Sequence, residues 1–433
     1  MRFLGVGDSN ELGDMYLRLA RAGHDVRVFV ENPVDRDILR GMVTLVSDWR
    51  AELAWVREAG ADGYVVFETA RHGAVQDELR REGLQVIGGG AYGDRLEEDR
   101  AFGQDVLRAA GLPTAPVYPF DDFNAAADFV RKRPGRYVLK HNGPSASYSR
   151  NYVGETADGA DMLSMLSLQA HRWPPGTKPD FVLMQHLSGV EVGVGAYFDG
   201  ERFLEPACLD FEHKRFFPGD LGEQTGEMGT VATYRGAERL FAASLGLVAA
   251  QLAASGYRGY VNLNTIVNDE GVWPLEFTCR FGYPGFAVLG SLQRDGWDAV
   301  FEKMQRRRGE PIETHDGYSV AVVLTVPPFP YPHGYAELAK GEPVTFDATT
   351  TALDREHFHF GEVEQAGDHL VTSGSIGYIM VVTGLGPTVA AAQADAYARV
   401  RKVVIPNVRY RNDIGKRVID RDLAELRRMG WLS

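Results

Sequence analysis

The first 92 residues alternate short apolar runs with longer amphipathic segments, and this pattern constrains the fold more than any other feature of the chain. Strands are expected at residues 3–6, 25–29, 63–67 and 84–87, with helices near 11–22, 48–59 and 74–82. Strands separated by helices of this length form a parallel α/β sheet. Ligands of such sheets bind at the carboxyl ends of strands. Residues 5–11, a glycine turn leading into a helix, are therefore expected at a ligand edge, although such glycines can also serve only the backbone angles.

The rest of the chain is expected to form further domains, because 433 residues are too many for one compact core. A helix at residues 99–110 ends at the stop signal Gly111-Leu112-Pro113, and residues 173–179 are a Pro/Gly-rich connection. Further strands are expected at 137–140, 181–184, 192–198, 260–267, 273–277, 319–325 and 377–383, with a last helix near 388–404. The expected domains are an N-terminal α/β domain at 1–92, a central domain at 93–113 and 181–310, a small subdomain at 114–180, and a C-terminal domain at 311–433.

Composition and charge exclude several classes of protein. A formal net charge of -13 argues against nucleic-acid or anionic-membrane partners that bind by bulk electrostatics. The two cysteines, Cys208 and Cys279, are too few for a disulfide framework or a cysteine-based zinc site. No run of 18 uncharged apolar residues and no signal segment is present, so we expect a cytoplasmic protein.

Residues 262–280 predict a β-hairpin with its turn at Asn268-Asp269-Glu270-Gly271. Alternation places Glu276, Thr278 and Arg280 on one face of the second strand, and pairing across the turn can bring Asn264 beside them. A carboxylate with further oxygen donors suits magnesium, which completes its shell with water and nucleotide phosphates. A half-buried polar strand face without a ligand is the alternative interpretation.

Two basic residues are candidates for phosphate binding. Lys140 closes an expected strand and precedes a Gly/Ser/Asn-rich loop at residues 141–151, so its ammonium can point at phosphates that the loop N–H groups cover. Arg100 offers a second cation at a helix start. Each could instead be a solvated surface charge, which is the commoner situation of a single Lys or Arg.

The run from Phe181 to Glu191 is expected to be a buried strand that leads into a short linker. The backbone of such a linker can offer N–H and C=O groups to an adenine edge, and Glu191 could accept hydrogen bonds from ribose hydroxyls. An ordinary strand followed by a surface glutamate is the alternative.

Taken in this order, these features resemble the ATP-grasp superfamily and, within it, the phosphoribosylamine–glycine ligase family of purine synthesis. Matching segments lie at residues 96–102, 138–140, 212–215, 224–229, 276–282 and 411–415, spread over nearly the whole chain. The resemblance implies an α/β protein with an ATP-grasp fold, an N-terminal parallel α/β domain and a C-terminal α+β domain. It also implies an ATP-dependent ligase that forms an amide from a carboxylate and an amine through an acyl phosphate.

The resemblance further implies a set of site residues. ATP is expected on Arg100, Lys140 and Glu191 and on the backbone of Gln185, His186 and Leu187. Magnesium, with manganese as the alternative ion, is expected on Glu276, Asn264 and Thr278. Arg280, Lys214 and Lys140 are expected to be catalytic, and Arg280 is expected to steer the carboxylate substrate.

The chain departs from the family pattern at several positions. Arg100 stands where the family has lysine, Thr278 where it has asparagine, and the loop at 141–150 has fewer glycines and a proline. Tyr283-Pro284-Gly285 replaces acidic residues suited to an amino group, and Asp8-Ser9-Asn10-Glu11 replaces a Gly-Arg-Glu-His run. We therefore expect a paralogue, monomeric or homodimeric, with altered small-molecule substrates. The alternatives are an ordinary phosphoribosylamine–glycine ligase and an inactive ATP-binding paralogue.

Overall fold

The computed structural model describes residues 1–142 and 151–432, which divide into two compact units. The first unit comprises Met1–Leu112 and Val190–Ser433, and the second comprises Pro113–Gly189. Most of the altered loop at 141–150 lies outside the described residues. Within the described part of the chain, no helix is both long and apolar enough to cross a membrane.

A five-stranded parallel sheet forms the N-terminal part of the first unit, in the order β3-β2-β1-β4-β5. Its strands are β1 (Arg2–Gly7), β2 (Asp25–Val30), β3 (Thr44–Val46), β4 (Gly63–Phe67) and β5 (Gln85–Ile87), and the helices are α1 (Gly13–Arg21), α2 (Leu53–Glu58), α3 (Gly73–Arg81) and α4 (Gly90–Glu98). The predicted alternation of strands and helices is confirmed. Two details of the prediction were wrong. The short edge strand β3 was missed, and α2 begins at Leu53 instead of near residue 48. Asp48 lies in a turn in which its carboxylate accepts the Arg50 N–H.

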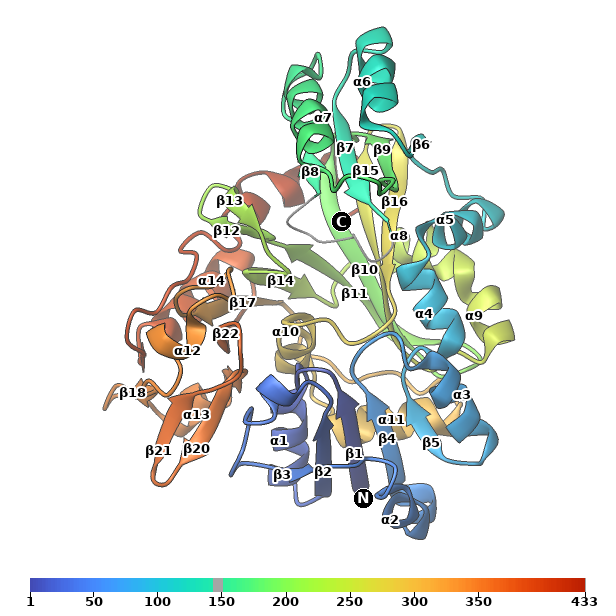
Figure 1. Cartoon of the computed structure of the whole chain (residues 1–433). Helices are drawn as coiled ribbons and strands as arrows, with labels where there is room; N and C mark the ends of the chain where they lie inside the picture. Colours follow the sequence, from blue (N-terminus) through green and yellow to red (C-terminus); the bar gives the residue numbers. More distant parts are fainter. Residues whose placement is uncertain (143–150, 433) are drawn as a thin grey trace. The chain divides into compact units, whose positions relative to one another are not determined.

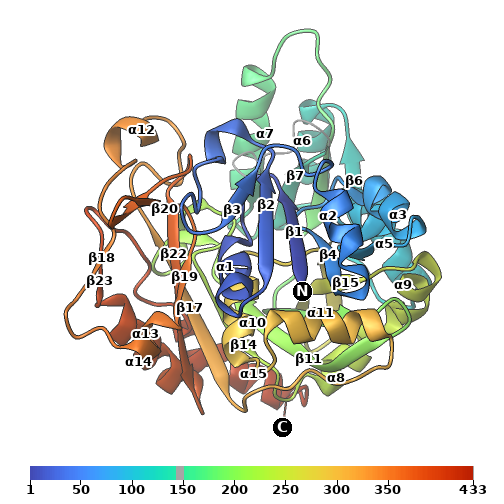
Figure 2. The same cartoon turned by 90° about the horizontal axis from the view of Figure 1, so that it is seen from below.

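Both faces of this sheet are covered, as parallel sheets require. Phe3 of β1 belongs to a core shared with α1, α10 (Gly285–Leu292) and α11 (Trp297–Arg306). Leu4 and Val6 point to the other face, into a core with Val56 of α2 and Leu79 of α3. Figure 2 shows the sheet from below with α10 and α11 close to it.

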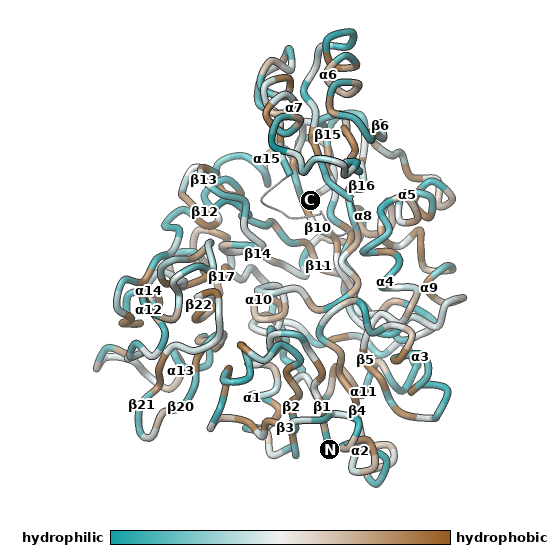
Figure 3. Tube along the Cα trace, in the orientation of Figure 1, coloured by the Kyte–Doolittle hydropathy of each residue, from teal (hydrophilic) through white to brown (hydrophobic). Residues whose placement is uncertain are grey.

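An eight-stranded antiparallel sheet forms the rest of the first unit, in the order β16-β15-β10-β11-β14-β17-β22-β19 (Figure 1). Its strands are β10 (Val190–Phe198), β11 (Phe203–Glu212), β14 (Gly229–Thr233), β15 (Gly259–Asn268), β16 (Gly271–Thr278), β17 (Tyr318–Thr325), β19 (Phe358–Phe360) and β22 (Tyr378–Gly386). Figure 3 shows β17 and β22 as apolar stretches, and both strands are buried along most of their length. Strands from the expected central and C-terminal domains therefore share one sheet.

The first unit contains further helices and three two-stranded pairs. They are α5 (Arg100–Ala109), α8 (Glu238–Ala242), α9 (Ala249–Ser255), α12 (Tyr335–Leu338), α13 (Ala352–Arg355), α14 (Val389–Val400), α15 (Leu423–Arg428), the π-helix η6 (Val418–Asp422), the 3-10 helices η1 (Pro33–Asp35), η2 (Gly60–Asp62) and η5 (Leu245–Val248), and the strand pairs β12 (Arg215–Phe217) with β13 (Leu221–Gln224), β18 (Thr345–Phe346) with β23 (Val403–Val404), and β20 (Val363–Ala366) with β21 (His369–Thr372). The helix expected at 388–404 was too long, because its end pairs as β23 with β18.

The second unit contains a four-stranded antiparallel sheet in the order β6-β9-β7-β8 and two helices. The elements are β6 (Val117–Phe120), α6 (Phe123–Lys132), β7 (Tyr137–His141), β8 (Tyr152–Val153), α7 (Ala160–Arg172) and β9 (Phe181–Gln185). Phe123, Leu139, Leu166 and Phe181 form its core. β9 was expected in the central domain, but it pairs with β6 and β7 and lies in this unit.

Candidate active site

One face of the eight-stranded sheet carries the polar residues that the hairpin pattern predicted. Asn264 of β15 lies directly opposite Glu276 of β16, and Asn262 lies opposite Thr278. This confirms the predicted pairing across the turn. Residues directly opposite in an antiparallel pair share a face, so the two pairs point to the same side of the sheet.

The same face continues onto β10 and β11. Gly193 pairs with Asn264 on one side and Asp210 on the other. A Cβ atom on Gly193 would lie 2.3 Å from Asp210 Oδ1, so a side chain there would displace this carboxylate. The missing side chain leaves room for the Asp210 carboxyl, which accepts from Asn262 Nδ2 at 2.6 Å. The opposite face is apolar, since Leu263 and Phe277 belong to the large hydrophobic core.

Lys214 lies among carboxylates of this face. Its ammonium is 2.8 Å from Glu212 Oε2 and 3.1 Å from Glu191 Oε1, and Asn264 Nδ2 donates to the same Glu191 oxygen at 3.0 Å. Burial lowers the pKa of Lys214, but the charges of Glu212, Glu191 and Glu276 outweigh burial and hold that pKa well above its ordinary value. Burial raises the pKa of Glu191, and the Lys214 charge and the Asn264 hydrogen bond bring it below its ordinary value.

Two further buried carboxyl groups border this cluster. Burial, reinforced by the Glu212 charge, raises the pKa of Asp210 to about 7. Burial, together with Glu212 and Asp210, raises the pKa of Glu227 well above its ordinary value. Among the described residues, the buried Glu227 Oε1 atom has no hydrogen-bond partner. The cluster therefore holds more carboxyl groups than cations, a composition that suits a divalent cation.

Sequence reasoning assigned no role to Asp210, Glu212, Glu227 or Asn262. Asp210 and Glu212 stand two residues apart at the end of β11, on either side of the apolar Phe211, and this spacing is a signal of one polar strand face. Asn262 also precedes Asn264 by two residues on β15. Glu227 lies in the loop before β14, within the matching segment 224–229, to whose residues no role was assigned.

Arg100 lies close to the same face. It is the first residue of α5, whose N-cap Asp99 accepts the Phe102 N–H. α5 is fixed to β16 because Gln104 Nε2 donates to the Leu275 carbonyl at 3.0 Å. Burial lowers the pKa of Arg100, and the negative charge of Glu276 opposes this shift. The structure thus brings the predicted cation of α5 near the predicted metal ligand of β16.

Arg280 follows β16 and is oriented by a carboxylate. Arg280 Nε lies 2.9 Å from Glu97 Oε1, and the Cys279 N–H donates to Glu97 Oε2 at 2.7 Å. Glu11 Oε2 lies 3.8 Å from Arg280 Nη1. Glu97 was not singled out in the sequence, and its two hydrogen bonds fix the direction of the Arg280 guanidinium.

Tyr283 lies just beyond Arg280, and its hydroxyl is buried. Among the described residues this hydroxyl has no hydrogen-bond partner. Its ring makes an edge contact with Tyr378, with centroids 5.4 Å apart, and burial raises the pKa of Tyr283 well above its ordinary value. An aromatic surface with one unsatisfied hydroxyl thus replaces the acidic residues of the family pattern.

The loops after β1, β2 and β4 carry a second charged group at the carboxyl edge of the five-stranded sheet. His72 Nε2 lies 3.3 Å from Glu31 Oε2 and 3.7 Å from Asp8 Oδ1, and Arg71 Nη1 lies 3.6 Å from Asp8 Oδ2. The hydrogen bond to His72 lowers the pKa of Asp8, and the bond to Asp8 raises that of His72. In this group Asp8 and Glu31 each lie near a basic side chain, whereas carboxyl groups outnumber cations around Lys214.

Glu68, the residue after β4, lies at the same edge but is fully buried. A Cβ atom on Gly7 would lie 2.3 Å from its carboxyl carbon, so glycine at position 7 is required for the close approach. Burial raises the pKa of Glu68 to about 8, and the charge of Glu11 adds to this effect.

In the second unit, Lys140 is a half-buried residue of β7 and lies opposite Val182 of β9. The N–H groups of Gln185 and His186 donate to the carbonyls of Pro116 and Arg136, each at 3.0 Å. Within the described residues, the Leu187 N–H donates to no backbone carbonyl. Gln185 and His186 could therefore serve a nucleotide through their other backbone groups without losing these bonds.

Comparison with known proteins identifies first the class and then the family. The family model described as phosphoribosylglycinamide synthetase, ATP-grasp (A) domain, matches residues 98–286, and that of the C domain matches residues 319–417. The chain is structurally similar to a phosphoribosylamine–glycine ligase of Thermotoga maritima (TM-score 0.71, 22% identity, 96% of this chain and 100% of that one) and to a biotin carboxylase of Campylobacter jejuni (0.65, 13%, 98% of each). The fold and the matching family models thus define an ATP-grasp ligase that forms C–N bonds.

Two curated relatives are phosphoribosylamine–glycine ligases. The protein of Nostoc sp. is 30% identical over 79% of this chain and 81% of its own length, and that of Pseudomonas aeruginosa is 29% identical over 81% and 82%. The chain belongs to the phosphoribosylamine–glycine ligase family. The resemblance drawn from the sequence motifs and the expected ATP-grasp fold are therefore confirmed.

Proposed function

We propose that this protein uses ATP and a divalent cation, magnesium or manganese, to join a small carboxylic acid to an amine. The observation that carries the proposal is the face on which Glu276 lies opposite Asn264 while Lys214 contacts Glu191 and Glu212. A binding protein without catalysis would have no need to bury this many interacting ionisable groups. Membership of a family of ATP-dependent ligases supports the same conclusion.

The divalent cation would be held by Glu276, with Asn264 and Thr278 as further oxygen donors. The excess of carboxyl groups in this region and the unsatisfied oxygen of Glu227 fit such an ion. The ion would neutralise the charge that grows on the transferring phosphoryl group. Arg100 supplies a fixed positive charge near Glu276 for the same purpose.

For ATP we propose separate contacts to its phosphates, adenine and ribose. Lys140 would contact the phosphates, Gln185, His186 and Leu187 would face the adenine through backbone groups, and Glu191 would accept from the ribose hydroxyls. Lys214 keeps Glu191 ionised and so able to accept these bonds. Its own pKa is raised, so Lys214 stays a cation and serves as an electrostatic group, not as a base.

Arg280 would orient the carboxylate substrate, because Glu97 fixes the direction of its guanidinium. The carboxylate oxygen attacks the γ-phosphorus of ATP, and ADP leaves. The amine nitrogen then attacks the acyl carbon, phosphate leaves, and an amide bond forms. Water must be excluded while the acyl phosphate exists, since it would hydrolyse this intermediate.

We further propose that glycine and phosphoribosylamine are not the preferred substrates. A glycine ammonium needs acceptors, whereas Tyr283 offers an aromatic face and one hydroxyl, which suits a larger acid. At the strand edge where we place a sugar phosphate in the ordinary ligase, Asp8 and Glu31 present acidic groups. These groups would repel a phosphate, although Arg71 and His72 reduce the effect.

The ordinary phosphoribosylamine–glycine ligase is the second candidate, and the curated relatives of this name favour it. ADP release measured with a panel of carboxylic acids and amines separates the candidates. Faster turnover with a larger acid than with glycine plus freshly generated phosphoribosylamine is the expected result. Turnover with that pair at about 1 per second or faster would show that the protein is an ordinary phosphoribosylamine–glycine ligase of purine synthesis. No ADP release with any pair would indicate an inactive ATP-binding paralogue.

A further inference from the structure

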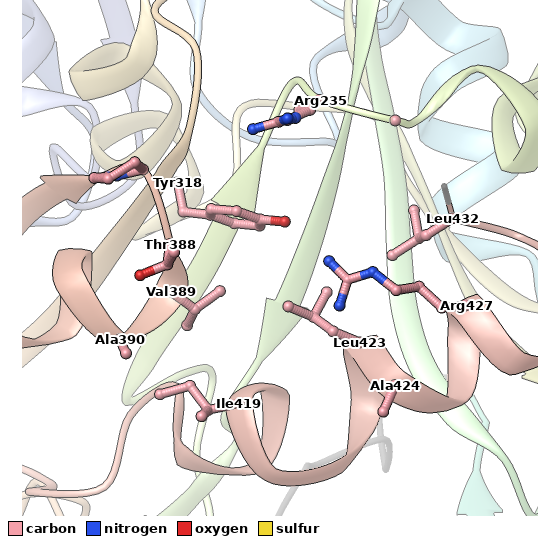
Figure 4. A pocket seen from close by; sticks show the side chains of 12 residues that line it. Arg235, Tyr318, Thr388, Val389, Ala390, Ile419, Leu423, Ala424, Arg427 and Leu432 are labelled. Atoms are coloured by element: carbon pink, nitrogen blue, oxygen red, sulfur yellow. The ribbon is translucent and has the colours of Figure 1, made fainter.

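A cavity of 350 Å³ lies in the first unit, among residues that have no part in the site described above. It is enclosed by the segment after β14, the start of β17, the start of α14, and the C-terminal helices η6 and α15 (Figure 4). Its lining residues are Arg235, Gly236, Tyr318, Pro387, Thr388, Val389, Ala390, Ile419, Leu423, Ala424, Arg427 and Leu432. The cavity could hold a ligand of about the size of a substituted benzene or a nucleoside.

One side of the cavity carries hydrogen-bond donors with positive charge. Figure 4 shows the Tyr318 hydroxyl and the Arg427 guanidinium pointing into the same space, with Arg235 above them. Arg235 makes an ion pair with Asp316 at 3.7 Å, but both side chains are largely exposed, so this pair contributes little. Arginine presents a planar fork of donors that matches carboxylate and phosphate groups.

The N-terminus of α14 adds positive potential at the same cavity. This helix is 12 residues long, and the side chain of its N-cap Thr388 accepts the Ala391 N–H. The N–H groups of Val389 and Ala390, in the first turn, have no acceptor within the helix. They and the aligned peptide dipoles favour an anion at this end.

The acidic residues of the neighbouring helices are paired elsewhere. Asp420 of η6 contacts Lys416, and Glu425 of α15 lies 2.9 Å from Arg428. Arg235 and Arg427 thus bring positive charge to the cavity in a chain whose formal net charge is -13. An anion that binds here must be attracted by these particular groups, because the protein as a whole repels it.

The other side of the cavity is apolar. Val389, Ile419, Leu423 and Leu432 line it, and Ile419 is 38% exposed. A bare inorganic anion would leave these side chains in contact with water. A ligand that also has an apolar body would cover them and gain stability from their burial.

We propose that this cavity binds a small organic anion, with its carboxylate or phosphate group between Arg235, Arg427 and the N-terminus of α14, and its apolar body against Val389 and Leu423. The Tyr318 hydroxyl donates to the same head group. This site is separate from the carboxylate face, and the proposal does not depend on the substrates of the ligase.

Isothermal titration of the full-length protein with four probes tests the proposal. Phenyl phosphate and benzoate carry both an anionic head and an apolar ring, phenol carries only the ring, and inorganic phosphate carries only the head. We expect phenyl phosphate or benzoate to bind at least about tenfold more tightly than phenol and inorganic phosphate. The better of the two identifies the preferred head group.

Substitutions of residues that line the cavity test whether the probes bind there. Arg235→Gln and Arg427→Gln should each weaken binding by about tenfold or more, and Tyr318→Phe should weaken it by a smaller factor. Arg401→Gln is the matched control, because it removes the same charge at the opposite end of α14. Thermal denaturation shows whether each variant is folded, and Tyr318→Phe, which removes a single oxygen atom, keeps the test valid if Arg427→Gln does not fold.

Three results would overturn the proposal. They are no binding of phenyl phosphate or benzoate at about 10 mM, equal binding of phenol and phenyl phosphate, or a loss of binding in Arg401→Gln as large as in the cavity variants.

Discussion

The carboxylate face of the eight-stranded sheet and the strand-end loops of the five-stranded sheet both gather ionisable groups, but they balance charge differently. Around Lys214, the carboxyl groups of Glu191, Glu212 and Glu276 outnumber the nearby cations. In the strand-end loops, Asp8 and Glu31 are matched by Arg71 and His72. An additional cation would therefore balance the negative charge of the first region, whereas in the second region basic side chains already offset the carboxylates.

Under the proposed function, this difference assigns the reaction and substrate recognition to different regions. The carboxylate face would bind ATP and the metal, and the strand-end loops and Tyr283 would contact the substrates. Phosphoryl transfer and the choice of substrate could then change independently, because different sheets and loops would carry them.

Glu276→Gln should have the largest effect on the carboxylate face. Removing the central carboxylate leaves the phosphates under-neutralised, so turnover should fall by about 100- to 1,000-fold or more while the fold persists. ADP release and circular dichroism measure the two effects. Glu270→Gln, at the exposed turn of the same hairpin, is the matched control and should behave as the unchanged protein. Near-normal turnover of Glu276→Gln would show that this face does not hold the metal.

Lys140→Ala should have the next largest effect, and it tests whether the second unit serves the same nucleotide. Losing a charge-assisted hydrogen bond to phosphate should weaken ATP binding by about 10- to 100-fold. Titration of ATP and magnesium measures this affinity. Lys132→Ala, which removes an exposed lysine at the end of α6 in the same unit, should leave it unchanged. Equal affinities for ATP in the two variants would remove Lys140 from the site.

Thr278→Asn should have a smaller and opposite effect. An amide oxygen reaches further than a hydroxyl and restores the family's ligand beside Asn262, so magnesium affinity should rise by about two- to tenfold. The magnesium dependence of ADP release measures the change. Thr278→Val, which removes the oxygen and keeps the shape, should lower magnesium affinity, and the same affinity in all three proteins would exclude residue 278 as a ligand.

Glu68→Gln should have the smallest effect, on stability and not on phosphoryl transfer. The pKa of Glu68 is raised to about 8 from 4.5, so between these values the folded chain keeps a proton that the unfolded chain has lost. The free energy of unfolding should therefore fall as pH rises through this window, by at most about 1.4 kcal/mol per pH unit. The variant should lose this part of the slope.

Denaturant unfolding at several pH values from 5 to 8 measures the contribution of Glu68. Glu78→Gln, an exposed residue of the neighbouring helix α3, is the control and should keep the slope of the unchanged protein. Identical slopes for all three proteins would show that Glu68 is ionised in the folded state.

Local patterns predicted the elements of the site but not their full environment. The hairpin turn predicted that the second strand passes beside Asn264, because both strands are adjacent in sequence. A regular register would place Leu275 opposite Asn264, and an irregularity between Asn264 and Thr265, which the sequence did not predict, brings Glu276 there instead. Asp210 and Glu212 join this face only through the pairing of β10 with both β11 and β15. The pairing of β10 with β15 joins residues about 70 positions apart, which no local pattern specifies.

The contacts of Arg280 also join residues that are far apart in the sequence. The sequence placed Arg280 on the face of the second hairpin strand, but β16 ends at Thr278, so Arg280 lies beyond it. Its orientation by Glu97 joins residues 183 positions apart. The edge strand β3 was missed for another reason. It is only three residues long and begins at an exposed threonine, so its pattern does not differ from that of a loop.

The transfer of oxygen from substrate to phosphate tests the central claim most directly. A carboxylic acid identified by ADP release is labelled with ¹⁸O in its carboxylate and incubated with ATP, magnesium and the amine, and the released phosphate is analysed by mass spectrometry. An acyl phosphate predicts one ¹⁸O atom in each phosphate that is released, and Glu276→Gln should slow its appearance in parallel with ADP. Phosphate that carries no ¹⁸O, released together with ADP and the amide, would contradict the account.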